Sequence, residues 1–232
     1  AIPIILLSLY FFENAVNVPY LDDMELVSTI NDIQDHPDHL FNILTRQQNE
    51  HRSFIPRSAA VLVYLLKGVL DFKSIIMLSF GNLLLLGFSI LLILRSTKLS
   101  LFYVIPISFF LFTPFVYTVH LTSLPAFQST LSIAFSFLAL YFLREKNKKS
   151  CYWAIPLAVL SSLTFLDGIS IFPVLLLWLA IQKRWRHMLF FGIFTLMYFY
   201  FYFFDFKLSS SSNVLPFKEL VAAVSVNFLT FI

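Results

Sequence analysis

Long runs of apolar residues alternate with short polar segments along most of this chain. After a polar stretch near the N-terminus, the apolar runs cover residues 75–94, 101–119, 129–143, 151–182, 188–204 and 221–232. A membrane-spanning α-helix needs about 20 consecutive apolar residues, and most of these runs approach or exceed that length. A transmembrane β-barrel would instead show short segments of alternating hydrophobicity. The pattern predicts an all-α fold, a polytopic transmembrane helical bundle.

Composition supports a membrane environment. The chain of 232 residues is 59% hydrophobic, has a mean hydropathy of +0.82, contains 29 Phe and is only 12% charged. A soluble domain carries about 25% charged residues. The net charge of +3 is carried by basic clusters between apolar runs. That placement is an orientation signal, so we expect membrane lipids rather than nucleic acid as partners.

The basic clusters predict the topology. They are Arg95 with Lys98, then Arg144, Lys146, Lys148 and Lys149, and finally Lys183, Arg184 and Arg186. The positive-inside rule places all of them in the cytoplasm. The run 151–182 lies between two cytoplasmic clusters, so it must cross the membrane twice as two helices. Leu166-Asp167-Gly168 is the expected break between these helices. If residues 58–70 also crossed the membrane, the basic clusters would face outward or the N-terminus would lie outside. We therefore expect residues 58–70 to form an amphipathic helix on the outer surface.

These positions predict one transmembrane domain over residues 1–232. It comprises an extracytoplasmic loop with interfacial helices at 13–74 and transmembrane helices with short loops at 75–232. The chain begins and ends inside apolar stretches, which predicts that it is part of a longer protein.

The polar loop contains two adjacent carboxylates, Asp22 and Asp23, just beyond the first apolar run. A partly desolvated carboxylate at a membrane surface can have a raised pKa and serve as a general base. The alternative is a helix N-terminus in water, where Asp is common. The two aspartates are the candidate catalytic residues.

A second cluster in the loop joins an acid, an imidazole and two guanidinium groups: Glu50, His51, Arg52 and Arg57. Arg binds phosphate through bidentate hydrogen bonds, so this cluster predicts a phosphate or diphosphate site. The alternative is an anchor among lipid headgroups. His36 and His39 lie beside aspartates, but their spacing matches no strong metal-ligand motif.

Besides Asn82, three polar residues stand out among the apolar runs, namely His120, Gln128 and Asp167. Ionisable groups in membrane segments are costly and are often functional. The predicted topology places these residues at turns on the same side as the polar loop. They are candidate substrate-binding residues that close over a shared site.

The order of these features resembles the GT-C superfamily of polyprenyl-phosphate-dependent glycosyltransferases. The resemblance rests on the acidic pair, on three surface helices at about 22–35, 37–48 and 57–70, and on short stretches. Those stretches are QNEHRSFIPR, LPAFQSTLSIAF and LDGISIFPVLLLW, which look like uncharacterised bacterial membrane proteins of this type.

The resemblance implies transfer of a sugar from a polyprenyl-phosphate donor to a hydroxyl of a glycan or lipid acceptor, outside the cytoplasm of a bacterial inner membrane. Asp22 or Asp23 would be the base, and Arg52 or Arg57, with His51, would hold the phosphate. Members differ in their use of a divalent metal, and the sequence does not decide that point. A lipid or polysaccharide transporter or flippase, and a non-catalytic subunit of a membrane assembly, are the alternatives.

Overall fold

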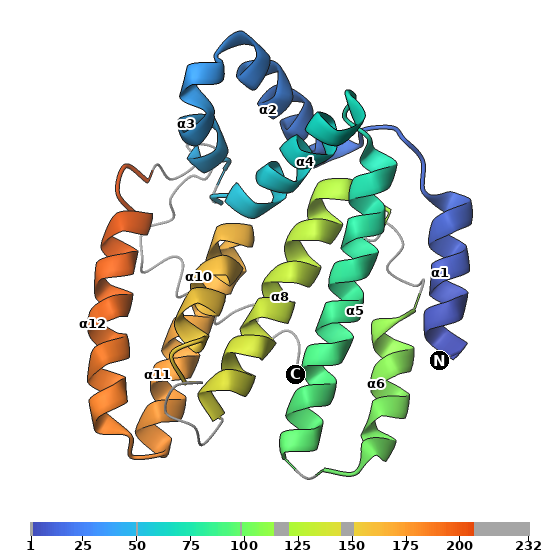
Figure 1. Cartoon of the computed structure of the whole chain (residues 1–232). Coiled ribbons are helices and arrows are strands. Elements are labelled where there is room, and N and C mark those ends of the chain that lie inside the picture. Colours follow the sequence, from blue (N-terminus) through green and yellow to red (C-terminus); the bar gives the residue numbers. More distant parts are fainter. Residues whose placement is uncertain (1, 50, 98, 114–120, 145–150, 207–232) are drawn as a thin grey trace, which may run out of the picture.

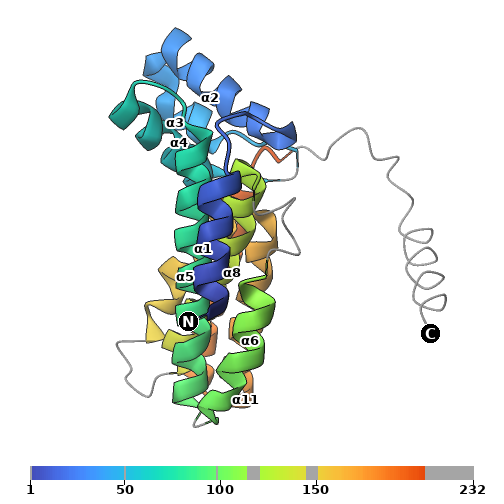
Figure 2. The ribbon, with the colours of Figure 1, turned by 90° about the vertical axis from the view of Figure 1, so that its right-hand side faces the viewer.

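Helices and short connections make up the described part of the chain. The computed structural model describes residues 2–49, 51–97, 99–113, 121–144 and 151–206, and no β-strand occurs among them (Figure 1). The predicted all-α fold is confirmed for these residues. One set of helices runs side by side, and a second group lies across one end of them (Figures 1 and 2).

The side-by-side helices form the body of the molecule. They are α1 (Ile2–Asn14), α5 (Phe72–Ser96), α6 (Val104–Leu111), α8 (Ser123–Arg144), α10 (Ala154–Thr164), α11 (Ile171–Ile181) and α12 (Trp185–Tyr202). Two of these, α5 and α8, are long and apolar enough to cross a membrane, with mean hydropathy of 2.3 and 1.6. The helices α1, α10 and α11 are apolar but shorter.

Most of the polar loop folds into a separate layer, which we call the cap. It consists of the 3₁₀ turn η1 (Leu21–Asp23), α2 (Met24–Asp35), the turn η2 (Pro37–His39), α3 (Leu40–Thr45) and α4 (Phe54–Lys67). The three surface helices predicted from the sequence are therefore present. The third begins at Phe54 rather than residue 57, and it ends before Gly68, whose φ of +73° suits a residue without a side chain.

The cap rests on the bundle through apolar side chains. Leu26 of α2, Ala60 and Val63 of α4 and Ile75 of α5 belong to one buried cluster. The buried side of α2 is formed by Leu26, Thr29 and Ile30. Leu21 of η1 and Met24, the first residue of α2, are instead exposed.

Small residues allow α8 and α10 to pack closely. The hydroxyl of Ser161 on α10 lies 3.0 Å from that of Ser132 and 2.9 Å from that of Ser136, both on α8. Ala139 and Ala158 are fully buried in the same region. Small side chains and hydroxyl hydrogen bonds are the usual means by which helices associate in lipid, where burial of apolar surface gives no driving force.

The long apolar run at 151–182 breaks where the sequence predicted. α10 ends at Thr164, the 3₁₀ turn η5 (Leu166–Ser170) follows, and α11 returns toward the other end of the bundle (Figure 1). Gly168 makes the turn possible, because a Cβ at this position would lie 2.3 Å from the backbone carbonyl carbon of Ser161.

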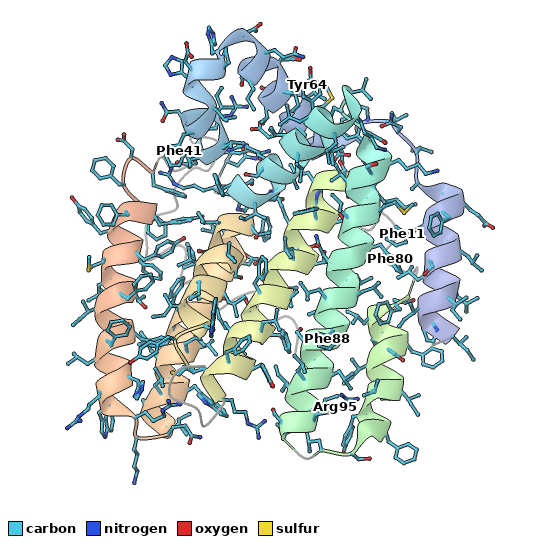
Figure 3. The ribbon with its side chains drawn as sticks, viewed as in Figure 1. Phe11, Phe41, Tyr64, Phe80, Phe88 and Arg95 are labelled. Carbon is cyan, nitrogen blue, oxygen red and sulfur yellow. The ribbon has the colours of Figure 1, made fainter. Side chains whose placement is uncertain are left out.

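Described members of the three basic clusters, Arg95, Arg144 and Arg184, gather at the end of the bundle opposite the cap. Arg144 donates to the hydroxyl of Ser96 at 3.1 Å, and Arg184 donates to the carbonyl of Leu143 at 3.0 Å. Arg95 lies at that end as well, whereas Phe41 and Tyr64 mark the cap (Figure 3). Lys98, Lys146, Lys148 and Lys149 lie outside the described residues. The described clusters therefore share one side, as the predicted topology requires.

Candidate functional site

The two adjacent aspartates of η1 face different surroundings. Asp23 is 1% exposed, and its carboxylate accepts hydrogen bonds from the backbone N–H groups of Leu124 at 2.7 Å, Ser123 at 3.3 Å and Tyr20 at 3.1 Å. Asp22 is exposed and lines a cavity. A 3₁₀ turn has about three residues per turn, so successive side chains point in well-separated directions.

Asp23 joins the cap to the start of α8. The first four N–H groups of an α-helix have no partner within the helix, and the positive end of the helix dipole favours a carboxylate there. Asp23 supplies that carboxylate from a segment about a hundred residues away in the sequence. Its two oxygens are occupied by three backbone donors, which assigns Asp23 a structural role.

The cavity beside Asp22 has a volume of about 210 Å³ and lies where the cap meets the bundle. Four segments that are far apart in the sequence form its walls. They contribute Asp22 from η1, Gln48, Asn49 and His51 from the cap, Leu124, Pro125, Gln128 and Ser129 from α8, and Phe165 from the residue before η5. We call this space the Asp22 cavity.

A tight turn holds the cap residues of the Asp22 cavity. The backbone N–H of Gln48 donates to the carbonyl of His51, and that of His51 donates to the carbonyl of Gln48, both at 2.8 Å. Asn49, inside the turn, has a φ of +48°, which Asn tolerates better than most residues. The imidazole of His51 lies against the ring of Phe165, with 4.4 Å between the ring centroids. Two flat surfaces therefore lie side by side in the wall.

Gln128 is placed differently from the prediction. Because α8 begins at Ser123, Gln128 lies in the second turn of the helix rather than in a connecting turn, and it is buried. Its amide donates to the hydroxyl of Ser53 at 2.6 Å. Gln128 thus ties the segment after His51 to α8 and also faces the Asp22 cavity.

Arg52 lies at the C-terminal end of α12. Its guanidinium donates to the carbonyls of Phe204 at 2.7 Å, Tyr202 at 2.9 Å and Thr45 at 3.1 Å, and it lies 5.9 Å from the centroid of the Tyr202 ring. A cation is favourable at the negative end of a helix dipole. No carboxylate among the described residues forms an ion pair with Arg52.

A second cavity, of about 390 Å³, contains Arg52. We call it the Arg52 cavity, and its walls are Phe41, Thr45, Arg52, Phe54, Leu163, Tyr198, Phe201 and Tyr202. Aromatic rings form most of this lining. Residues close in the sequence line the two cavities: His51 lines one and Arg52 the other, and Phe165 lines one and Leu163 the other.

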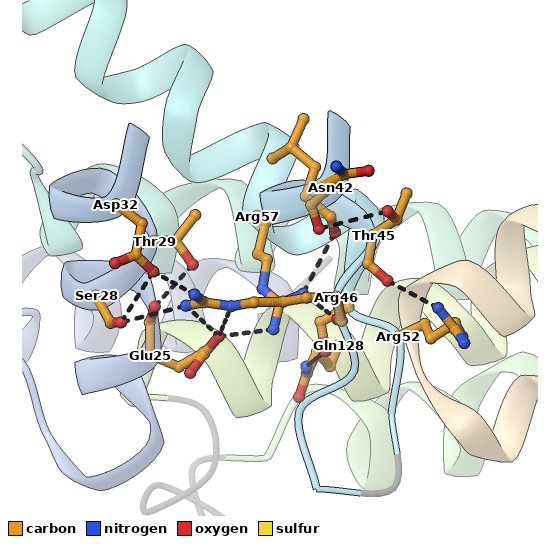
Figure 4. A network of polar contacts seen from close by, with 12 residues as sticks. Glu25, Ser28, Thr29, Asp32, Asn42, Thr45, Arg46, Arg52, Arg57 and Gln128 are labelled. Atoms are coloured by element: carbon orange, nitrogen blue, oxygen red, sulfur yellow. Dashed lines mark hydrogen bonds and ion pairs between the residues drawn. The ribbon is translucent and has the colours of Figure 1, made fainter. Parts of the chain in front are cut away.

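Arg57 belongs to a polar network inside the cap (Figure 4), and it lines neither cavity. It is fully buried, pairs with Glu25 at 2.6 Å and donates to the carbonyls of Leu44 and Arg46. Burial lowers the pKa of Arg57, and the Glu25 carboxylate partly opposes that shift. Glu25 also pairs with Arg46 at 3.1 Å. The site that the structure gives Arg57 is an internal ion-pair network rather than a surface open to phosphate.

The other predicted site residues lie away from the cavities or outside the described residues. Asp167 is exposed on η5, where its carbonyl accepts a hydrogen bond from Ser170, and it lines neither cavity. Glu50 and His120 lie outside the described residues. Thus Asp22, His51 and Gln128 line one cavity, while Arg52 lines the other.

Four polar or aromatic residues of the Asp22 cavity were not predicted, namely Gln48, Asn49, Ser129 and Phe165. The first two could have been noticed in QNEHRSFIPR, because a polar pair with Asn is typical of a tight turn. Phe165 directly precedes the predicted break. Ser129 carries no signal in the sequence that distinguishes it from other helical serines.

Within the described ranges, no group of three or more His, Cys, Asp or Glu side chains is placed to hold a metal ion. His36 and His39 are three positions apart in the sequence, and the centroids of their rings are 6.2 Å apart. No family model, curated protein or solved structure matches this chain. The site must therefore be interpreted from its own geometry and chemistry.

Proposed function

We propose that this chain is a membrane glycosyltransferase of the GT-C type. It moves a sugar from a polyprenyl-phosphate donor to a hydroxyl of a glycan or lipid acceptor on the extracytoplasmic face. The observation that carries the proposal is the exposed residue Asp22 in the lining of a small cavity, together with a second cavity that combines aromatic rings with the cation of Arg52, the residue after His51.

Asp22 is the general base in this proposal. Its carboxylate accepts the proton of the acceptor hydroxyl while the acceptor oxygen forms a bond to the anomeric carbon. The bond between that carbon and the phosphate oxygen breaks, and the polyprenyl phosphate leaves with the bonding electrons. A positioned base contributes typically about 10²–10⁴-fold to the rate of such a step. Asp23 is unsuited to the role because backbone donors occupy both of its oxygens.

Arg52 stabilises the leaving phosphate. A guanidinium has five N–H donors, and three hydrogen bonds to carbonyls leave donors available for an anion. Its charge has no carboxylate partner within the described part of the chain. Negative charge grows on the phosphate as the bond breaks, so a fixed cation lowers the barrier. The surrounding aromatic rings suit the first isoprene units of the lipid.

The proposed membrane arrangement follows from the ends of the bundle. α5 and α8 span the bilayer, and the shorter α1, α6, α10, α11 and α12 cross where protein shields them or where the bilayer is locally thin. The basic end faces the cytoplasm of a bacterial inner membrane, and the cap faces outward. The two cavities, which lie beneath the cap, then open on the extracytoplasmic side.

The test is sugar transfer in membranes that carry the full-length protein. Asp22→Asn should abolish transfer of a radiolabelled sugar from its polyprenyl-phosphate donor, while Asp38→Asn, an exposed change elsewhere in the cap, should retain it. Both variants must be present in the membrane at the level of the wild type. If Asp22→Asn transfers sugar at the rate of the wild type, the proposal is wrong.

A flippase for the same lipid-linked sugars is the second candidate, favoured by the broken helix pair α10 and α11. Discontinuous helices are a common feature of transporters. A flippase requires no general base. Movement of a fluorescent polyprenyl-phosphate sugar across proteoliposomes, unaffected by Asp22→Asn, would therefore support it over the transferase.

A further inference from the structure

A pocket of about 360 Å³ lies between α1, α5 and α6, and it shares no lining residue with the Asp22 and Arg52 cavities. We call it the α6 pocket. Among the described residues, the one polar side chain in its lining is that of Ser108, whose hydroxyl donates to the carbonyl of Ile105 within α6 at 2.8 Å. Phe88 and Ile105, which also line it, are 52% and 53% exposed, so the pocket can be reached from the surface of the bundle. Such walls suit a hydrocarbon rather than a polar ligand.

A glycine and a loosely packed helix leave this space open. A Cβ at Gly87 of α5 would lie 3.0 Å from Cζ of Phe112, so the absence of a side chain there lets α5 approach the end of α6. α6 itself has no buried residue, although almost all of its residues are apolar. An apolar surface of this kind, in a chain that crosses a bilayer, is covered by lipid or by protein.

The length of the α6 pocket matches one leaflet of a bilayer. Along α5 its lining extends from Leu84 to Leu94. Ten residues of α-helix rise about 15 Å, which is half of the roughly 30 Å thickness of the hydrocarbon core. In the proposed membrane arrangement this is the cytoplasmic half, because the basic residue Arg95 follows directly. A single acyl chain of the cytoplasmic leaflet has the matching length and chemistry.

Arg95 supplies a positive charge at the cytoplasmic end of the α6 pocket. It follows Phe88 by seven positions and Leu91 by four, so it lies on the same side of α5 as these lining residues (Figure 3). Arg95 is exposed and forms no ion pair with a carboxylate in the described ranges. Arg144, which donates to the adjacent Ser96, adds a second cation. Guanidinium groups bind phosphate oxygens well, and basic sites at the cytoplasmic ends of helices suit anionic headgroups.

We propose that the α6 pocket binds an anionic phospholipid of the cytoplasmic leaflet, with one acyl chain in the pocket and the phosphate at Arg95. The apolar lining accounts for the chain, and the free charge of Arg95 accounts for the headgroup. A zwitterionic phospholipid also carries an ammonium group, which weakens its attraction to a cation. This inference rests on the proposed membrane arrangement but not on the transfer of a sugar.

The experiment measures lipid binding by native mass spectrometry of the full-length protein in detergent. The probes are phosphatidylglycerol and phosphatidylethanolamine with identical acyl chains. Arg95→Gln removes the charge at the pocket, and Arg186→Gln is the control, because Arg186 is exposed on α12. Gly87→Leu places a side chain in the pocket, and Gly81→Leu is the control, because nothing lies within 4 Å of a Cβ there. Thermal unfolding followed by circular dichroism establishes which variants are folded.

We expect the wild type to bind phosphatidylglycerol about fivefold more tightly than phosphatidylethanolamine, the usual effect of one basic residue at an anionic surface. Arg95→Gln should lose this preference, and Arg186→Gln should keep it. Gly87→Leu should bind both lipids about tenfold more weakly, because its side chain occupies the space of the acyl chain. Gly81→Leu should bind both lipids as the wild type does.

Each of four results would overturn the inference. The first three are equal affinity of the wild type for the two lipids, an Arg95→Gln variant that keeps the preference, and a folded Gly87→Leu variant that binds both lipids like the wild type. The fourth is the absence of bound phospholipid in the wild type, which would show that another protein segment or a second copy of the chain covers the pocket. If Gly87→Leu does not fold, the comparison of Arg95→Gln with Arg186→Gln decides alone. The proposed transferase is tested separately, by sugar transfer in Asp22→Asn.

Discussion

The carboxylate of Asp23 lies 2.7 Å from the backbone nitrogen of Leu124, in the first turn of α8. This contact joins η1 of the cap to α8 of the bundle across about a hundred residues of sequence. It also separates Asp23 from Asp22, which is free to face the cavity. Asp23 is therefore a structural residue and Asp22 the candidate base, so substitutions at the two positions should have different effects.

Replacing Asp23 should destabilise the fold, and replacing Asp22 should not. Asp23→Ala removes a buried carboxylate with three backbone donors, and we expect a loss of about 2–3 kcal/mol in the free energy of unfolding. Asp22→Ala, an exposed change, should stay within about 0.5 kcal/mol. Thermal and denaturant unfolding of the protein in nanodiscs would measure both. Equal stabilities for the two variants would contradict the assignment.

Arg57 should be needed for folding of the cap. Its guanidinium is fully buried against Glu25, so Arg57→Ala leaves a partly buried carboxylate with one fewer partner and should cost about 3–5 kcal/mol. The double variant Arg57→Met with Glu25→Gln removes both charges together. Its loss in the free energy of unfolding should be less than the sum for Arg57→Met alone and Glu25→Gln alone. Limited proteolysis at the cap would report the loss. A strictly additive double mutant would show that the pair is not coupled.

Gly168 should not tolerate even a methyl group. In Gly168→Ala the new Cβ would meet the backbone of Ser161 at 2.3–2.4 Å, which forces α10 and η5 apart and should cost about 1–3 kcal/mol. Gly81→Ala on α5 is the control, because nothing lies within 4 Å of a Cβ there and alanine favours a helix by about 0.5–1 kcal/mol. The Tm of the two variants should therefore change in opposite directions. A Gly168→Ala variant as stable as the wild type would contradict the close contact.

The start of α5 should lose stability in acid through Asp71. A hydrogen bond from Lys67 lowers the pKa of Asp71 below its usual value of 3.8, and bonds from Ser74 act in the same direction. A carboxylate whose pKa is lower in the folded state stabilises the fold above the unfolded pKa. That contribution is lost as the pH falls through the folded pKa. Wild type should therefore exceed Asp71→Asn in stability at pH 7, and the difference should shrink below about pH 3.8.

Unfolding of both proteins at pH 7 and at pH 3 tests this prediction. Asp38→Asn serves as the control, since Asp38 is exposed at the other end of the cap. A difference between wild type and Asp71→Asn that does not depend on pH would exclude the proposed origin.

The amino-acid sequence by itself determined the local elements of this protein. The all-α class, the cap helices and the break near Gly168 all come from apolar periodicity and from residues that stop helices, and neighbouring positions in the chain contain that information. Crossing of a membrane stays a prediction from the same patterns, and among the described helices α5 and α8 are long and apolar enough for it.

Only the tertiary structure decided which of the candidate residues meet. Asp22 and Asp23 are equivalent in the sequence, and their roles separate because Asp23 accepts the first N–H groups of α8, about a hundred residues away, while Asp22 lines the cavity. In the same way Arg57 is buried in the cap, where it pairs with Glu25. Residues of α8 and of the turn at Gln48 together line the Asp22 cavity. These outcomes depend on contacts between distant segments, and a local pattern does not specify which distant partner a polar side chain will find.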